Sequence, residues 1–144
     1  MTDSTKPNLR PLLIAAFLFG ALGTGFELIL LEHTEEAWQW LPITLLGTSI
    51  PLAAVLTFKP TRTVIRLFTF IMVLFLGAGG IGLIQHFRGN IEFELEMYPS
   101  MGGWELIWEA LKGATPTLAP GTMTLLGLIG IIYTFRHPLT GADQ

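Results

Sequence analysis

Residues 64–85 read VIRLFTFIMVLFLGAGGIGLIQ, and this stretch decides the class of fold. Its single charged residue is Arg66, near the beginning. A bilayer core about 30 Å thick requires about 20 predominantly apolar residues in a helix. The stretch therefore predicts a helix that crosses a membrane. Three further stretches share its character, at about residues 11–31, 41–58 and 118–135. We expect an all-α integral membrane bundle of four transmembrane helices, formed by one domain over residues 1–144.

The composition agrees with a membrane protein. Hydrophobic residues make up 51% of the chain and charged residues only 13%, with a mean hydropathy of +0.58. The chain has no cysteine, which excludes disulfides, thiolate metal sites and covalently attached c-type haem. The net charge of −3 is too small to suggest nucleic acid as a partner.

Charged residues divide between the two sides of the predicted bundle. Six basic residues flank one set of span ends, with only Asp3 and Asp143 as counter-charges: Lys6, Arg10, Lys59, Arg62, Arg66 and Arg136. The connections at the other ends carry almost all of the glutamates. Lys and Arg accumulate on the cytoplasmic side of membrane proteins. We therefore expect a multi-pass protein of the plasma (inner) membrane with both termini in the cytoplasm.

Aromatic residues mark the exterior connections. Trp38 and Trp40 open the second span, where indole rings favour the headgroup region. In the longer connection, Trp104, Ile107, Trp108 and Leu111 follow i, i+3, i+4, i+7 spacing. This spacing predicts an amphipathic helix over about 104–112 that lies along the outer membrane interface. The alternative interpretation is that this helix has only a structural role, in which it packs on the bundle and covers its outer end.

The exterior connections also form an acidic surface. Residues 90–97 read NIEFELEM, an alternation that predicts an extended segment with its carboxylates on one side. Such a row could attract a cation or a basic partner, or be the hydrated face of a short strand. The predicted acidic surface comprises Glu32, Glu35, Glu36, Glu92, Glu94 and Glu96.

Small residues indicate where the spans touch. Membrane helices associate through close packing of small residues and through polar contacts. Gly20, Gly23 and Glu27 in the first span have the same spacing as Gly79, Gly82 and His86 in the third. We expect these two parallel spans to meet through these stripes. The fourth span adds a third small-residue face at Gly127 and Gly130.

Glu27 is the ionisable residue placed deepest in an apolar span. A carboxylate inside a membrane span is costly, is expected to face the bundle interior, and is a functional candidate by default. The depths of the two spans place His86 a few residues further out, within direct or water-bridged reach, and Arg88 is a second candidate partner. The competing interpretation is a neutral packing residue or one that reaches the interface.

Three hypotheses for function follow from these residues. The first is a non-enzymatic accessory, assembly or partner-binding subunit, which has a protein partner and needs no cofactor. The second is a homo-oligomeric ion- or proton-coupled transport element that uses Glu27 and His86. The third is a metal- or haem-binding protein, for which His33, Glu36 and His86 are weak candidate ligands.

Overall fold

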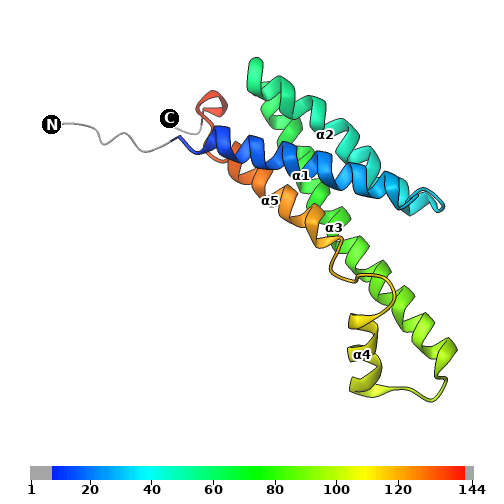
Figure 1. The fold of residues 1–144 in the computed structure, drawn as a ribbon. Helices are drawn as coiled ribbons and strands as arrows, with labels where there is room; N and C mark the ends of the chain where they lie inside the picture. Colours follow the sequence, from blue (N-terminus) through cyan, green and yellow to red (C-terminus); the bar gives the residue numbers. More distant parts are fainter. Residues whose placement is uncertain (1–7, 142–144) are drawn as a thin grey trace.

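The computed structural model describes residues 8–141, and in this range the chain is all-helical, as the sequence predicts (Figure 1). Its α-helices are α1 (Arg10–Leu30), α2 (Trp40–Phe58), α3 (Arg62–Met97), α4 (Gly103–Lys112) and α5 (Gly121–Thr134). Short 3-10 helices, η1 (Ala37–Gln39) and η2 (Pro138–Thr140), precede α2 and follow α5. Asp3, Lys6 and Asp143, which enter the orientation argument, lie outside the described residues.

Three helical segments are long and apolar enough to cross a membrane: α1, η1 with α2, and α3. The fourth apolar helix, α5, has 14 residues, which is about 21 Å at 1.5 Å per residue. The predicted span of 118–135 is therefore shortened at both ends. Residues 117–120 form turns before α5, and Phe135 is already extended after it. The protein thus has three to four apolar helices of membrane-spanning character.

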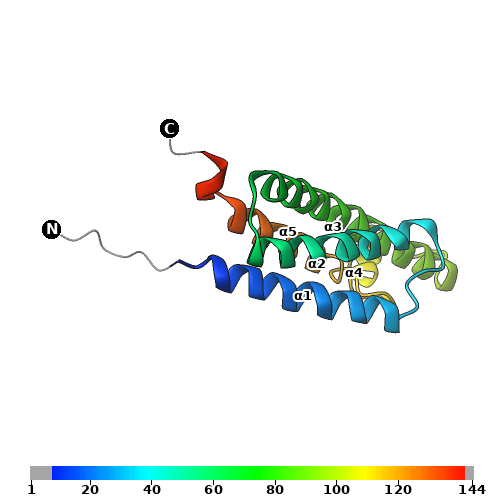
Figure 2. The ribbon, with the colours of Figure 1, turned by 90° about the horizontal axis from the view of Figure 1, so that it is seen from above.

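The long helices form a ring in the order α1, α2, α3 and α5, in which each helix packs against the next and α5 closes on α1. Figure 2 shows the four helices running along the bundle. Neighbouring helices in such a ring are antiparallel. α1 and α3 are therefore parallel to each other, and the ring order places them on opposite sides of the bundle, across its diagonal. They meet through large side chains in the centre of the bundle. Phe17 of α1 packs edge-on against Phe68 of α3, with ring centroids 5.2 Å apart.

The expected glycine contact between the first and third spans is wrong, because α5 occupies that position. A side chain at Gly79 or Gly82 would collide with Pro120 or Thr124 of the α5 start. Gly127 and Gly130 of α5 in turn face Met72 and its neighbours on α3.

The first span also packs differently from expectation. A Cβ at Gly20 would lie 2.7 Å from Leu126 of α5, whereas Gly23 has nothing within 4 Å. Small residues therefore do mark close helix contacts, but these contacts join α3 to α5 and, at Gly20, α1 to α5.

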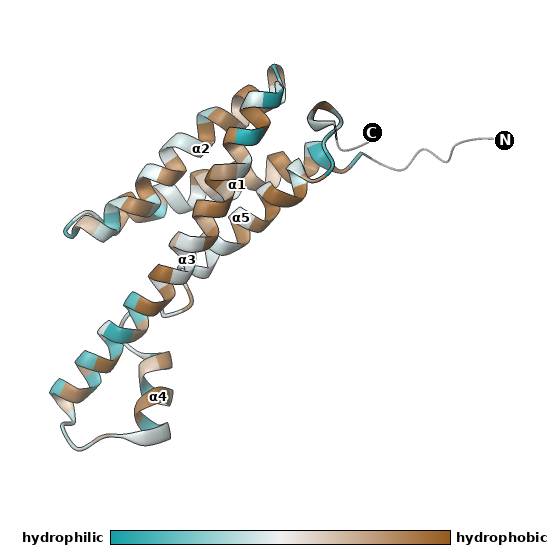
Figure 3. Ribbon diagram, turned by 180° about the vertical axis from the view of Figure 1, so that it is seen from behind, coloured by the Kyte–Doolittle hydropathy of each residue, from teal (hydrophilic) through white to brown (hydrophobic). Residues whose placement is uncertain are grey.

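The expected extended segment at residues 90–97 is also wrong, because α3 continues through it to Met97. No glycine or proline interrupts residues 91–97, and Glu, Leu and Met are good helix formers. In a helix, Glu92 and Glu96 lie on one face and Glu94 points away from them. The three carboxylates therefore do not form a row. Figure 3 shows hydrophilic residues recurring along this outer part of α3, beyond the start of α5.

One end of the bundle is closed by Arg10. Its guanidinium donates to the carbonyl oxygens of Tyr133, Phe135 and Arg136, at 3.3, 3.2 and 2.9 Å. A cation at these carbonyls also complements the negative end of the α5 dipole. The beginning of α1 and the end of α5 consequently lie together. At the opposite end, α3 continues past the other helices and α4 lies beside it (Figure 1).

Candidate functional site

The outer part of α3 and the whole of α4 form a helical hairpin, which we call the outer hairpin (residues 86–112). The amphipathic periodicity correctly predicted α4 as a helix, with bounds that differ by one residue. α4 packs against α3 through Ala110, which is fully buried, while Leu106 and Glu109 are half-buried. Its attachment to α3 therefore uses a different face from the one that carries the tryptophans.

A single buried side chain, Asn90, ties the hairpin together. Its Nδ2 lies 2.9 Å from the Ala110 carbonyl, 2.8 Å from the Thr115 carbonyl and 2.9 Å from the Thr117 hydroxyl. Its Oδ1 accepts hydrogen bonds from the Thr115 amide and hydroxyl, at 3.0 and 2.8 Å. The last carbonyl groups of a helix have no hydrogen-bond partner within the helix, and Asn90 supplies such a partner to the Ala110 carbonyl of α4.

The fit around Asn90 is close as well as polar. A Cβ at Gly113, the residue that ends α4, would lie 2.5 Å from the Asn90 side chain. Asn90 was missed by sequence reasoning, which treated it as the first residue of an extended segment. The available signal was a polar residue four positions after His86 on the Gly79–Gly82–His86 face of one helix.

The residues that the sequence predicted to form the apolar face of α4 are exposed in the structure. Trp104 is 73% exposed and Trp108 is 52% exposed, and Ile107 and Leu111 lie beside them. Glu105 is exposed as well, and Lys112 pairs with Glu109 at 2.7 Å on the same helix. An exposed apolar face that carries two tryptophans is typical of a surface that contacts lipid or another protein.

The α1–α2 connection presents a second exposed group of residues. The Trp40 indole donates to the Thr34 carbonyl at 3.2 Å, and the Gln39 side chain accepts from the Glu35 and Glu36 amides. Trp38 is 60% exposed. Glu32, Glu35 and Glu36 are exposed in this turn, whereas Glu92, Glu94 and Glu96 lie on the outer hairpin. The predicted acidic residues thus belong to two elements.

Glu27 does not face the bundle interior as expected, because its side chain is exposed on α1. The α1 residues that do point inward include Ile14, Phe17 and Ala21. Within the described residues, the Glu27 carboxylate makes no hydrogen bond or ion pair, so no bonded Glu27–His86 pair is present. Glu27 lies three residues before the end of α1 at Leu30, about 4.5 Å along the helix axis, and therefore belongs to the last turn of this helix.

The structure instead brings His86 close to His33. Their ring centroids lie 6.4 Å apart, with His33 in the turn after α1 and His86 on α3. Both side chains are half-buried, and the His86 Nδ1 is buried without a hydrogen-bond partner. Burial, together with the neighbouring His86, lowers the pKa of His33. Two of the three weak candidate ligands are therefore neighbours.

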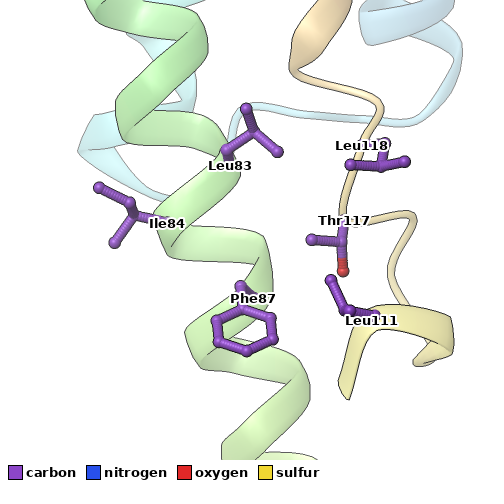
Figure 4. A pocket seen from close by; sticks show the side chains of 6 residues that line it. All are labelled: Leu83, Ile84, Phe87, Leu111, Thr117 and Leu118. Atoms are coloured by element: carbon purple, nitrogen blue, oxygen red, sulfur yellow. The ribbon is translucent and has the colours of Figure 1, made fainter. Parts of the chain in front are cut away.

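A shallow apolar groove separates the outer hairpin from the start of α5 (Figure 4). Its volume is about 250 Å³, and almost all of its surface is apolar. The side chains around it are Leu83, Ile84, Phe87, Leu111, Thr117 and Leu118. It offers no polar group for catalysis beyond the Thr117 hydroxyl, which is already bonded to Asn90 and Ala110.

Among residues 8–141, no three His, Cys, Asp or Glu side chains gather in an arrangement that could hold a metal ion. The distinctive features of the chain are thus the outer hairpin and the His33–His86 pair. Comparison with protein-family models, with curated proteins and with solved structures found no match to this chain.

Proposed function

We propose that this protein is a non-enzymatic membrane subunit that binds a partner protein through the outer hairpin. The observation that supports the proposal is the orientation of α4. Asn90 holds this helix on α3 with several hydrogen bonds, and yet Trp104 and Trp108 remain exposed. Burial of large aromatic side chains dominates the energy of protein–protein contacts, and such residues are enriched at interfaces.

The distance to which the outer hairpin extends beyond the bundle favours a protein, and not lipid, as the partner of the hairpin tip. α3 continues for about twelve residues past Gln85, which is about 18 Å along a helix. α4 runs back along it, so that Trp104 lies at the end near Met97, far from the bundle. The headgroup layer adds only about 5–8 Å to each side of the hydrocarbon core. A partner at the membrane surface would meet Trp104 first, with Glu92, Glu96 and Glu105 supplying a negative rim.

We place the outer hairpin on the exterior side of the plasma membrane, with both termini in the cytoplasm. The support is the charge distribution. Arg10, Lys59, Arg62 and Arg66 flank helix ends at the Arg10 end of the bundle, whereas the glutamates belong to the opposite end and the hairpin. The chain has no cysteine, so single cysteines can test this orientation. In intact cells, a membrane-impermeant maleimide should label Glu105→Cys and leave Lys59→Cys unlabelled; the reverse pattern would contradict the placement.

The docking proposal is tested by native mass spectrometry of the protein extracted gently from its own host membrane. The wild-type chain should carry a partner in fixed stoichiometry. The double variant Trp104→Ser and Trp108→Ser should lose it, because the two side chains on the exposed face of α4 are removed. Trp38→Ser is the matched control, since Trp38 is similarly exposed on the α1–α2 connection. A chain that is monomeric throughout, or a partner that the double variant retains, would refute the proposal.

A further inference from the structure

His33 is held in place by the way α1 ends. The His33 amide donates to the Leu28 carbonyl at 3.0 Å, and the Glu32 amide donates to the Ile29 carbonyl at 3.1 Å. This pair of bonds is a Schellman motif, in which the residue just after the helix C-cap adopts the left-handed conformation. Glu32 fills that position with φ +50°, a conformation that glycine adopts more readily. The turn therefore directs His33 from a defined backbone position, in spite of the backbone strain at Glu32.

His86 is held from the other side by α3. It follows Gly79 and Gly82 on the helix face that packs against the beginning of α5. Its Nδ1 is buried and has no hydrogen-bond partner among the described residues. A buried polar atom without a partner is unfavourable and requires an explanation, of which an ion at the site is one. The two rings thus come from separate elements and lie with their centroids 6.4 Å apart.

We propose that His33 and His86 form a site for a late first-row transition-metal ion of the Cu²⁺ or Zn²⁺ class. Bonds of about 2.0–2.1 Å from one ion to a nitrogen of each ring place the ring centres about 5 Å apart at a tetrahedral angle, and about 6.4 Å apart when the two nitrogens lie on opposite sides of the ion. The observed separation of 6.4 Å matches the second arrangement, which suits square-planar Cu²⁺. An ion bound to Nδ1 of His86 would also give that buried atom its missing partner.

Two imidazole nitrogens would occupy only part of the coordination sphere of such an ion. Because no third side chain completes a metal-holding group within residues 8–141, water would fill the remaining positions. Such an open nitrogen site favours Cu²⁺ over Zn²⁺, in the usual order of affinities. The proposed metal site does not require a partner protein bound to the exposed face of α4.

The experiment is a titration of the full chain with Cu²⁺ and, separately, with Zn²⁺, after treatment with a chelator. The protein is reconstituted in lipid nanodiscs and carries no polyhistidine tag, because a tag would bind the same ions. We expect one ion per chain. His33→Gln and His86→Gln should each weaken binding at least about tenfold, since even loss of a group that only supports a ligand costs about 10- to 100-fold. His137→Gln is the matched control, because His137 follows α5 at the Arg10 end of the bundle.

Electron paramagnetic resonance of the Cu²⁺-loaded wild type gives a readout that does not depend on the variants folding. Hyperfine structure from two imidazole nitrogens is the expected result. A spectrum with oxygen ligands only, binding that survives both substitutions, or loss of binding in the His137 control would overturn the proposal. Absence of binding to the wild-type chain would overturn it as well. A purified protein with a haem absorbance band would also overturn it, because the histidines would then hold a different group.

Discussion

Replacement of Asn90 by leucine should detach α4 from α3 while the bundle stays folded. Leucine has a similar size, so the substitution removes polar contacts with little change in packing volume. The two Nδ2 hydrogens are shared among three acceptors, and Oδ1 accepts two further bonds. Four hydrogen bonds at about 1 kcal/mol each give a loss of about 4 kcal/mol. At about 1.4 kcal/mol per tenfold change, the detached population should rise roughly a thousandfold.

Detachment of α4 can be measured as a change in the distance between two spin labels, because the chain has no cysteine that would react with the label. Spin labels on Glu96→Cys and Glu105→Cys, both exposed, would report the separation of the α3 end from α4 by pulsed dipolar spectroscopy. The background with Asn90 intact should give a narrow distance distribution, and Asn90→Leu a broad one with longer components. Amide hydrogen exchange in α4 should accelerate in parallel, because local opening controls exchange.

The matched control is Gln85→Leu, which makes the same type of change at an exposed position on the same helix. It should leave the distance distribution and the exchange rates of α4 unchanged. If Asn90→Leu behaved like this control, the hydrogen bonds of Asn90 would not be what holds α4, and our reasoning about the hairpin would be refuted.

Three further predictions concern the bundle and its ends. Gly127→Ala should destabilise the protein by about 1–3 kcal/mol, because the new Cβ would lie 2.8 Å from the Met72 carbonyl oxygen; thermal unfolding in detergent measures this, and Gly80→Ala, which meets nothing within 4 Å, is the control. Glu32→Gly should raise the unfolding temperature by a few degrees, since glycine relieves about 1 kcal/mol of left-handed strain; no gain would mean that the glutamate side chain itself stabilises the turn. Burial, and secondarily Arg10, lowers the pKa of His137, so protonation of this ring is disfavoured in the folded state. The stability of the protein should therefore fall as the pH drops below the ordinary histidine pKa of about 6.5. In unfolding experiments between pH 5 and 8, His137→Gln should flatten this part of the stability profile, and an unchanged slope would contradict the assignment.

The sequence alone determined the properties that depend on residues close together in the chain. Long apolar runs predicted the helices of the bundle, because a membrane demands about 20 such residues for each crossing. The i, i+3, i+4, i+7 spacing predicted α4 to within one residue of its observed beginning. Alternation over residues 90–97 was misleading, because a short alternating run also fits a helix that has already started upstream.

The tertiary structure decided which of these elements meet. Equal glycine spacing in the first and third spans suggested a direct contact, but ring closure placed α5 beside both helices and turned Glu27 outward. The Asn90 clamp and the His33–His86 pair each join residues that are distant in the chain. Local periodicity shows which face of a helix is apolar, but the neighbour of that face depends on how all helices pack together. For this reason the partners of Asn90 and His86 emerged only from the folded chain.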